Sequence, residues 1–394
     1  MTLKYEMEEE RRAAARIKVI GVGGGGCNAV AHMLASGLEG VEFHVLNTDA
    51  QALGASPVPN KLAIGAKITQ GRGAGADPEI GKQAALEDTE RIVELLEDAD
   101  MVFVTAGMGS GTGTGAAPVV AAMAKEMDAL TVAVVTMPFA FEGERRIRQA
   151  EEGLAKLTES VDTVITIPNE RLLALAPRGT SILDAFRLGH EFLRRTVQDL
   201  VEIVTTPGFV NRDFSDLRST LAGMGHAVLG TATARGDNAV IEAARQAISC
   251  PLIEQTGIRG ARNVLLNVTG SARLGLHEVN DACQMIRQAA GRSDVQVNFG
   301  LVFNEALADT VKVTLIATGF DARGQEMEQP LEQPAAQDVW LSETRPEPVP
   351  VAVAAAQPVA VETKPPNGTP PIPEPEQFSD LDTPAYLRQR RLLH

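Results

Sequence analysis

Three glycine-rich segments are the part of the sequence best suited to holding a ligand. They are GVGGGGCN (residues 21–28), GRGAGADP (71–78) and GMGSGTGTG (107–115). Glycine lets backbone N–H groups approach a phosphate closely, and the positive end of a helix dipole strengthens that contact. The hydroxyl groups of Ser110, Thr112 and Thr114 add donors without positive charge. The loops therefore predict a site for nucleotide phosphates, although no lysine follows them as it does in a P-loop.

The first loop also fits a dinucleotide-binding interpretation. Gly21 to Gly26 match G-x-G-x-x-G after a strand-like run, and Asp49 follows the next run about 20 residues later. This interpretation leaves GSGTGTG unexplained, and the later chain offers no histidine or cysteine group suited to hydride transfer. An NAD-binding Rossmann dehydrogenase therefore stays as the alternative.

Two further groups of charged residues could take part in chemistry. Asp213 and Asp216 in NRDFSDL are three residues apart, so both carboxylates could face one water molecule. From the sequence alone, acidic residues after a Pro–Gly turn indicate a helix cap instead. Glu142 and Arg146 in FEGERR have the spacing of a solvated i,i+4 ion pair.

The elements that must position these residues follow an α/β pattern. Continuous apolar runs at 17–22, 41–47, 101–106, 131–137 and 164–168 alternate with helical patterns. Such runs indicate a parallel sheet covered on both faces, with its loops converging at the carboxyl ends of the strands. A long helical pattern covers 181–205 and ends at Pro207 and Gly208. The runs NVLLNVTG, VQVNFGLVF and VKVTLIATG then predict a second, smaller α/β or α+β domain.

Composition excludes several classes of function. The formal net charge is −15 and the chain has one Trp and two Tyr, whereas nucleic-acid binding needs a basic stripe or a stacking platform. Cys27, Cys250 and Cys283 form no CxxC motif, which fits buried thiols in a reducing cytosol. The first residues lack the apolar region of a signal peptide, and no run of about 18 apolar residues could span a membrane. We therefore expect a cytoplasmic protein that binds no nucleic acid and does not insert into the membrane.

The C-terminal part of the chain differs in composition from the rest. Thirteen of the 22 prolines follow residue 321, together with Glu, Gln and Ala. Such a segment cannot bury enough apolar surface to offset its ordering entropy, so it predicts a disordered linker. Apolar and basic residues return in FSDLDTPAYLRQRRLLH, which indicates a peptide that binds a partner.

Several of these motifs together resemble one known family. KVIGVGGGGCNAV, GMGSGTGTGAAPVVA, FAFEGERR and NRDFSDL resemble the successive signatures of FtsZ, the bacterial tubulin-like cell division GTPases of the tubulin/FtsZ superfamily. The resemblance extends from about Ile17 to Phe320 and returns in DTPAYLRQRR. Ser110 stands at the second glycine of the superfamily's GGGTGTG loop.

The resemblance implies a GTP/GDP site, with Mg²⁺ carried by the nucleotide and no separate metal-binding residues. The phosphates would lie against Gly24, Gly25, Gly26, Cys27, Asn28, Gly111, Thr112 and Gly113, with Gly75 and Ala76 sensing the γ-phosphate. Glu142 and Arg146 would contact the ribose and neighbouring groups, and Phe186 and His190 the base. The family usually has Asp or Asn where His190 stands, and a neutral imidazole accepts only one hydrogen bond. Either guanine selectivity is weakened, or Asn28 carries more of the recognition.

The resemblance also implies how the site is completed. Asn211, Asp213 and Asp216 match the loop that enters the nucleotide pocket of the next subunit, where the carboxylates would orient the attacking water. Such a head-to-tail contact builds open filaments and makes GTP hydrolysis depend on assembly. The implied function is a self-assembling cytoskeletal GTPase at the midcell division ring, on the inner face of the membrane. A divergent paralogue with weak turnover, acting as a structural partner, is the alternative within the family.

The tail would bind membrane-anchor and regulatory division proteins. The residues implied in that contact are Asp382, Pro384, Tyr386, Leu387 and Arg388. The complete division of the chain is then a flexible arm (1–16), a Rossmann-like GTP-binding domain (17–180), a central helix (181–206), a C-terminal activation domain (207–320), a Pro-rich linker (321–377) and the tail peptide (378–394).

Overall fold

The computed structural model describes residues 15–177, 179–206, 209, 214–250, 253 and 257–320. The expected linker and tail, and all but the last two residues of the expected N-terminal arm, lie outside these ranges. Asn211 and Asp213 also lie outside them.

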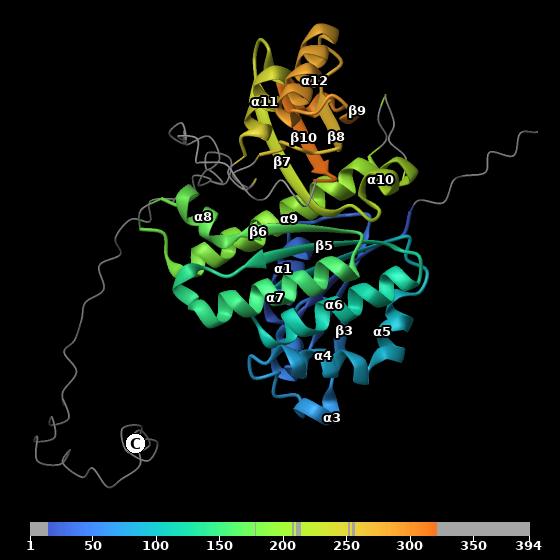
Figure 1. The fold of residues 1–394 in the computed structure, drawn as a ribbon, viewed down its shortest axis with the longest axis vertical. Coiled ribbons are helices and arrows are strands. Elements are labelled where there is room, and N and C mark those ends of the chain that lie inside the picture. Colours follow the sequence, from blue (N-terminus) through green and yellow to red (C-terminus); the bar gives the residue numbers. More distant parts are fainter. Residues whose placement is uncertain are drawn as a thin grey trace, which may run out of the picture. The chain divides into compact units, whose positions relative to one another are not determined.

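The described residues form one ten-stranded sheet in the order β3-β2-β1-β4-β5-β6-β7-β10-β8-β9 (Figure 1). The strands are β1 (Ile17–Val22), β2 (Val41–Asn47), β3 (Asn60–Ala63), β4 (Met101–Gly107), β5 (Leu130–Met137), β6 (Thr163–Pro168), β7 (Gly225–Arg235), β8 (Asn263–Gly270), β9 (Gln296–Phe303) and β10 (Thr310–Thr318). Neighbouring strands run parallel except at β10, which is antiparallel to both β7 and β8.

Helices connect the strands and cover the sheet. They are α1 (Gly23–Ala35), α2 (Ala50–Ala55), α3 (Ala66–Thr69), α4 (Pro78–Glu87), α5 (Thr89–Leu96), α6 (Gly111–Glu126), α7 (Glu144–Ser160), α8 (Asn169–Leu175), α9 (Ile182–Thr205), α10 (Phe214–Leu221), α11 (Ala239–Ile248) and α12 (Leu276–Ala290). The described residues also form two short 3-10 helices, η1 (Ala140–Glu142) and η2 (Glu305–Leu307).

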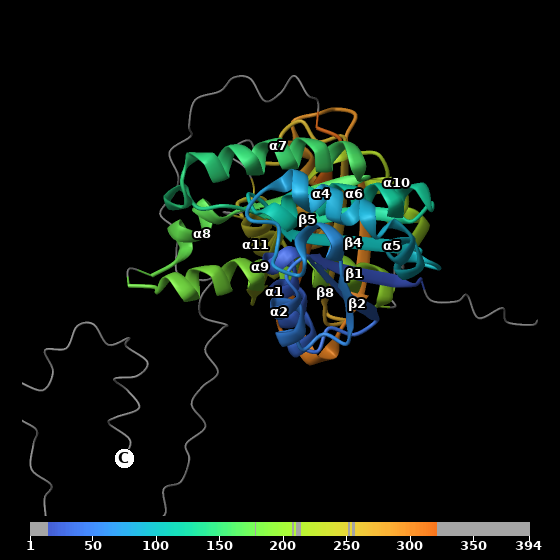
Figure 2. The same cartoon turned by 90° about the horizontal axis from the view of Figure 1, so that it is seen from below.

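Two hydrophobic cores hold the sheet between its helices. Successive strand residues point to opposite faces, so Val19 packs in one core and Ile20 in the other. The first core takes in Leu193 and other residues of α9 together with α1, and the second takes in Val120 and its neighbours on α6. Figure 2 shows the two sets of helices on opposite sides of the strands. Burial on both faces explains why these strands are continuous apolar runs.

The α/β fold class expected from the sequence is confirmed. β1, β2, β8 and the long helix α9 match the expected runs to within one residue at each end. Strands β3 and β7 were not expected. Because β7 pairs with β6 through Thr163 and Gly225, the described sheet continues from the N-terminal to the C-terminal strands. The sixfold division of the chain remains a prediction.

Candidate functional site

The three glycine loops meet at one edge of the sheet. β1 and β4 are parallel neighbours, with Val22 opposite Ala106, so the loops that follow them start side by side. A Cβ placed on Gly23 would come 2.7 Å from the Gly113 nitrogen. A Cβ placed on Gly111 would come 2.9 Å from the Asp77 nitrogen. The loops therefore touch through their backbones, and this close approach is what their glycines permit.

The first turn of α1 is well suited to a phosphate. Its N-cap residue, Val22, makes no side-chain cap, and the turn contains no acidic residue. The first four N–H groups of a helix have no partner within the helix, and the helix dipole makes this end positive. No atom lies within 4 Å of a Cβ placed on Gly24, so this side of the loop is open. A dense set of backbone donors facing open space fits the phosphates of a nucleotide.

Cys27 and Asn28 point in different directions from this loop. The Cys27 side chain is buried, and its Sγ lies 3.6 Å from the Leu46 carbonyl oxygen. Burial raises the pKa of the Cys27 thiol to about 12, so the thiol stays protonated. Cys27 can therefore offer a ligand only its backbone, whereas the Asn28 side chain is exposed.

Ser110 reduces the number of N–H groups that the third loop can offer to a phosphate. It is the N-cap of α6, and its hydroxyl accepts a hydrogen bond from the Gly113 N–H at 3.2 Å. The same hydroxyl donates to the Gly107 carbonyl oxygen at 3.0 Å. The Thr112 hydroxyl pairs with the Thr48 hydroxyl at 2.6 Å. The expected phosphate donors Gly111, Thr112 and Gly113 thus lie at the site, with one of their N–H groups already bonded within the loop.

The loop at 71–78 has an unusual backbone. Gly75 and Ala76 both have positive φ angles, 59° and 61°. For alanine, this left-handed conformation costs about 1–2 kcal/mol. The Ala76 carbonyl oxygen accepts a hydrogen bond from the Gln149 amide on α7 at 3.3 Å. A strained, exposed backbone beside the other two loops makes this segment a candidate part of the same site.

Glu142 and Arg146 lie next to the third loop. Glu142 accepts the Phe139 N–H at 2.9 Å and pairs with Arg146 at 3.0 Å. A Cβ on Gly109 would come 2.7 Å from Cγ of Arg146, so this pair packs against the loop. The i,i+4 pair expected from the spacing is present, and it is placed where a ligand of the loops could meet the half-exposed guanidinium.

Phe186 and His190 lie on the N-terminal half of α9. Phe186 makes an edge-to-face contact with Phe139, with ring centroids 5.3 Å apart. Burial lowers the pKa of His190, and the nearby His32 of α1 lowers it further. Asn28 lies one turn before His32 on α1, so the helix face directed at His190 also carries Asn28.

Asn169 is a candidate that the sequence analysis missed. It is buried at the start of α8, and its Oδ1 has no hydrogen-bond partner among the described residues. A Cβ on Gly189, the residue before His190, would come 3.3 Å from this oxygen. An unpaired buried amide oxygen beside His190 is suited to receiving a ligand donor. Nothing in the sequence around Asn169 distinguishes it from a helix N-terminal residue.

Asp216 lies at the opposite edge of the sheet from the glycine loops. On its helix α10, Arg218 pairs with Asp128, which precedes β5 by two residues. The Leu221 carbonyl oxygen accepts a hydrogen bond from Thr163, the first residue of β6. α10 therefore sits at the amino ends of parallel strands whose carboxyl ends carry the loops. A seven-residue strand spans about 23 Å, so Asp216 cannot reach the loops of its own chain.

The structure gives the dinucleotide alternative no support. Asp49 caps α2, and its carboxylate accepts the N–H groups of Gln51 and Ala52 at 2.9 and 3.0 Å.

Over the described ranges, no cluster of three or more His, Cys, Asp and Glu side chains could hold a metal ion. Within the same part of the chain, no helix is both long and apolar enough to cross a membrane.

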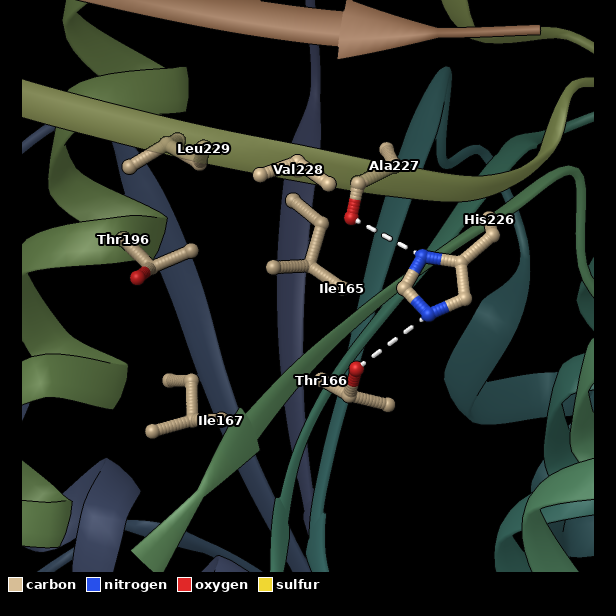
Figure 3. Close-up of a pocket in the computed structure, with 8 residues that line it drawn as sticks. All are labelled: Ile165, Thr166, Ile167, Thr196, His226, Ala227, Val228 and Leu229. Atoms are coloured by element: carbon tan, nitrogen blue, oxygen red, sulfur yellow. Dashed lines mark hydrogen bonds between the residues drawn. The ribbon is translucent and has the colours of Figure 1, made fainter. Parts of the chain in front are cut away.

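A small cavity lies where β6 and β7 meet α9 (Figure 3). His226 lies at its rim, with Nε2 3.4 Å from the Thr166 hydroxyl and Nδ1 3.3 Å from the Ala227 carbonyl oxygen. The rest of the lining is mainly apolar: Ile165, Ile167, Thr196, Val228 and Leu229. Its volume of about 20 Å³ suits one water molecule, and it shares no residue with the glycine loops.

Comparison with protein families gives two matches along the chain. Residues 16–177 match the GTPase domain of the Tubulin/FtsZ family. Residues 225–321 match the C-terminal domain of the FtsZ family.

Solved structures with the same fold include two of FtsZ from M. jannaschii. An empty FtsZ dimer is 38% identical, with 78% of this chain and 89% of that chain covered and a TM-score of 0.72. A point mutant is 39% identical, with 79% and 92% covered and the same TM-score of 0.72. CetZ2 from Haloferax volcanii, solved as a GTPgS-bound protofilament, is 23% identical, covers 78% and 94%, and has a TM-score of 0.68. At that identity the likeness to CetZ2 concerns the fold alone.

Proposed function

This chain belongs to the Tubulin/FtsZ family, and from this premise we propose that it hydrolyses GTP at the contact between head-to-tail subunits of a division-ring filament. Its GTPase domain makes it a guanine-nucleotide-binding protein. The position of Asp216 is the observation that supports hydrolysis at a contact between subunits. The glycine loops and α10 lie at opposite edges of one sheet, so a single chain cannot bring them together.

A second copy, stacked along the strand direction, would bring α10 to the loops. The backbone N–H groups of α1 and α6 would hold the phosphates of GTP, and Mg²⁺ would arrive with the nucleotide. Asp216 of the next subunit, with Asn211 and Asp213, would orient the attacking water. Phosphoryl transfer depends mainly on positioning and charge stabilisation, so a carboxylate placed beside the water suffices for this role.

Exposed apolar residues at the two ends of α9 support the same arrangement. At the nucleotide end, the Ile182 and Leu183 side chains are 69% and 61% exposed. At the other end, Phe209 is 76% exposed and lies 5.3 Å from the Phe303 ring, centroid to centroid. The 24 residues of α9 separate these patches by about 36 Å. Different apolar patches at opposite ends favour a heterologous contact, which builds an open filament.

The FtsZ and CetZ2 structures also support self-association, because they are described as a dimer and as a protofilament. We further propose that the chain acts in cell division, in the cytoplasm on the inner face of the membrane at midcell. Its C-terminal tail would recruit membrane-anchor and regulatory proteins there.

A second candidate function within the family is a structural partner with weak turnover. Two observations favour it: the Gly113 N–H is bonded to Ser110, and His190 on α9 can accept only one hydrogen bond. In this case the protein would join filaments without contributing much hydrolysis.

Measuring phosphate release against protein concentration tests the proposal. If sites are completed between subunits, turnover per subunit rises with concentration and then levels off. Asp216→Ala should retain GTP binding while turnover falls roughly 10²- to 10⁴-fold, and Ser215→Ala on the same helix should change neither. Turnover per subunit that is independent of concentration, or unchanged in Asp216→Ala, contradicts the proposal. NAD should neither bind nor support assembly.

A further inference from the structure

A groove runs over α6, with α4 and α5 on one side and α7 on the other (Figure 1). Two glycines let the flanking helices close onto α6. A Cβ on Gly115 would come 1.9 Å from the Pro78 carbonyl oxygen, and one on Gly153 would come 2.2 Å from Cγ2 of Thr114. The groove has a volume of about 740 Å³, and small-molecule sites measure roughly 300–1,000 Å³. It is therefore large enough to hold an organic ligand.

Thr114 gives one end of the groove two oxygen atoms without their usual hydrogen-bond donors. This residue lines the groove and is only 3% exposed. Its hydroxyl oxygen has no hydrogen-bond partner among the described residues. Pro118, four residues later inside α6, has no N–H, so the Thr114 carbonyl oxygen lacks its usual helical donor. A ligand that donates hydrogen bonds would satisfy such oxygens, and an ammonium group has three N–H donors.

Two glutamates lie beside the Thr114 end of the groove. Glu79 lies in the first turn of α4, which packs against α6 at this end. Glu152 directly precedes Gly153, which packs against Thr114. Lys82 lines the same end and offsets one of the two negative charges. The net negative charge of this end is suited to one cation.

Two further glutamates lie at the far end of the groove, where α6 and α7 meet. Lys125 Nζ donates to the Val161 carbonyl oxygen at 2.8 Å, so the last turn of α6 lies beside the end of α7. Glu126 and Glu159 line the groove there, and Lys156 offsets one of their charges. This end is therefore suited to a second cation.

The middle of the groove is apolar, with a floor formed by Val119, Ala122 and Met123 of α6. The two acidic ends lie eleven residues apart along α6 (114 to 125) and eight residues apart along α7 (153 to 161). At the helical rise these spacings correspond to about 16 Å and about 12 Å. A matching ligand is about that long, apolar in its middle and positively charged at both ends.

We propose that this groove binds a linear aliphatic diamine, an alkyl chain with an ammonium group at each end. One ammonium donates to the two Thr114 oxygens and pairs with Glu79 and Glu152. The other pairs with Glu126 and Glu159, and the methylene groups lie on the apolar floor. This site is independent of the proposed GTPase site, since no glycine-loop residue that we assign to the phosphates lines the groove.

Calorimetric titration of the full chain with amines of different length tests the two-ended arrangement. The dilute protein is titrated without nucleotide at physiological ionic strength, where non-specific charge attraction is screened. The nitrogens of extended 1,10-diaminodecane are about 14 Å apart and those of 1,4-diaminobutane about 6 Å, so the longer diamine should bind at least tenfold more tightly. 10-Amino-1-decanol has the same length and a single cation, and it should bind about fivefold more weakly than 1,10-diaminodecane. Equal affinities within either comparison overturn the proposal.

Variants that remove charge locate each end of the ligand. Glu126→Gln with Glu159→Gln should lower the affinity for 1,10-diaminodecane about fivefold and leave that for 10-amino-1-decanol unchanged, because the single cation lies at the Thr114 end. Glu79→Gln with Glu152→Gln should weaken the binding of both ligands. Glu151→Gln, an exposed neighbour outside the groove, is the control and should change neither affinity. Double variants that bind both ligands as the parent does contradict this site.

Thr114→Val tests the contact with the unpaired hydroxyl. Valine has a similar shape and lacks the oxygen, so both ligands should bind about fivefold more weakly. The variant should unfold at the same urea concentration as the parent or a higher one, because the hydroxyl has no partner among the described residues. Unchanged affinity for both ligands in a folded Thr114→Val would overturn the assignment of an ammonium group to this end.

Discussion

Replacing His190 with aspartate should strengthen GTP binding and leave ATP binding unchanged. Guanine presents N–H donors at N1 and N2, and a neutral imidazole accepts only one hydrogen bond. Hydrogen bonds to a charged acceptor contribute about 1.5–3 kcal/mol. Position 190 is partly buried, and burial of the new carboxylate offsets part of this gain. The expected net gain is about 1.4 kcal/mol, which is about tenfold in Kd.

Calorimetric titration with GTP and ATP between pH 6 and 8 measures this effect. His277→Asp, on α12 in the C-terminal part of the fold, is the matched control and should leave both affinities unchanged. Adenine has an acceptor at N1 and would leave the aspartate without a partner. Equal preference for GTP over ATP in His190→Asp and the parent would refute the reasoning and assign base recognition to Asn28 and Asn169.

The pH dependence of the parent follows from the direction of the shift. The folded-state pKa of His190 is lowered below its ordinary 6.5 by burial and by His32. Below about pH 6.5 the unfolded chain therefore binds more protons than the folded chain, so stability falls as the pH drops from 6.5 to the folded pKa. GTP affinity should fall at lower pH, as the pH passes down through the folded pKa of His190, because protonation of the folded imidazole removes the acceptor. His32→Gln removes the neighbouring charge and should move the midpoint of this loss to higher pH.

Three further outcomes are expected. Ala76→Gly should raise the free energy of unfolding by about 1 kcal/mol in urea denaturation, since glycine adopts the positive φ without strain; no gain would mean that the loop relaxes. Lys312→Met should destabilise the fold by about 3 kcal/mol, because Lys312 Nζ lies 2.7 Å from the carboxylate of the buried Asp199. Adding Asp199→Leu should recover most of this loss of stability. A double variant as unstable as Lys312→Met alone would contradict the charge argument. Removing residues 378–394 should leave GTP turnover intact and abolish recruitment to membrane-bound partners in a vesicle co-sedimentation assay; a loss of turnover would argue against this separation.

The strands that the sequence predicts well are those buried on both faces. β1 and β4 are continuous runs of large apolar residues, and such runs identify a strand without knowledge of its neighbours. β7 was missed because most residues of GHAVLGTATAR are small, and it forms a strand through its pairing with β10. The requirement for glycine at position 230 becomes clear only from the fold, where a Cβ would come 2.1 Å from the Ala247 carbonyl oxygen of α11.

The candidate site, like the fold, could be predicted from the sequence only in part. The loops at 21–28 and 107–115 were expected to converge because each follows a strand of one parallel sheet, and strand order alone is enough for that inference. The Ser110 bond to the Gly113 N–H and the unpaired Asn169 oxygen depend on local geometry that residue types do not specify. The distance of Asp216 from the loops likewise follows from the path of α9 across the sheet.

Mixing two variants with opposite defects tests most directly whether the site is completed between subunits. Leu183→Asp places a charge at the nucleotide end of α9, and Phe209→Asp places one at the other end. Each variant alone should bind GTP as the parent does but should neither assemble nor turn over. In an equal mixture, the intact nucleotide end of Phe209→Asp meets the intact α10 end of Leu183→Asp. The account predicts dimers without filaments and turnover restored to about half that of the parent, because each pair holds one complete site. A mixture as inactive as its components, although both bind GTP, would contradict it.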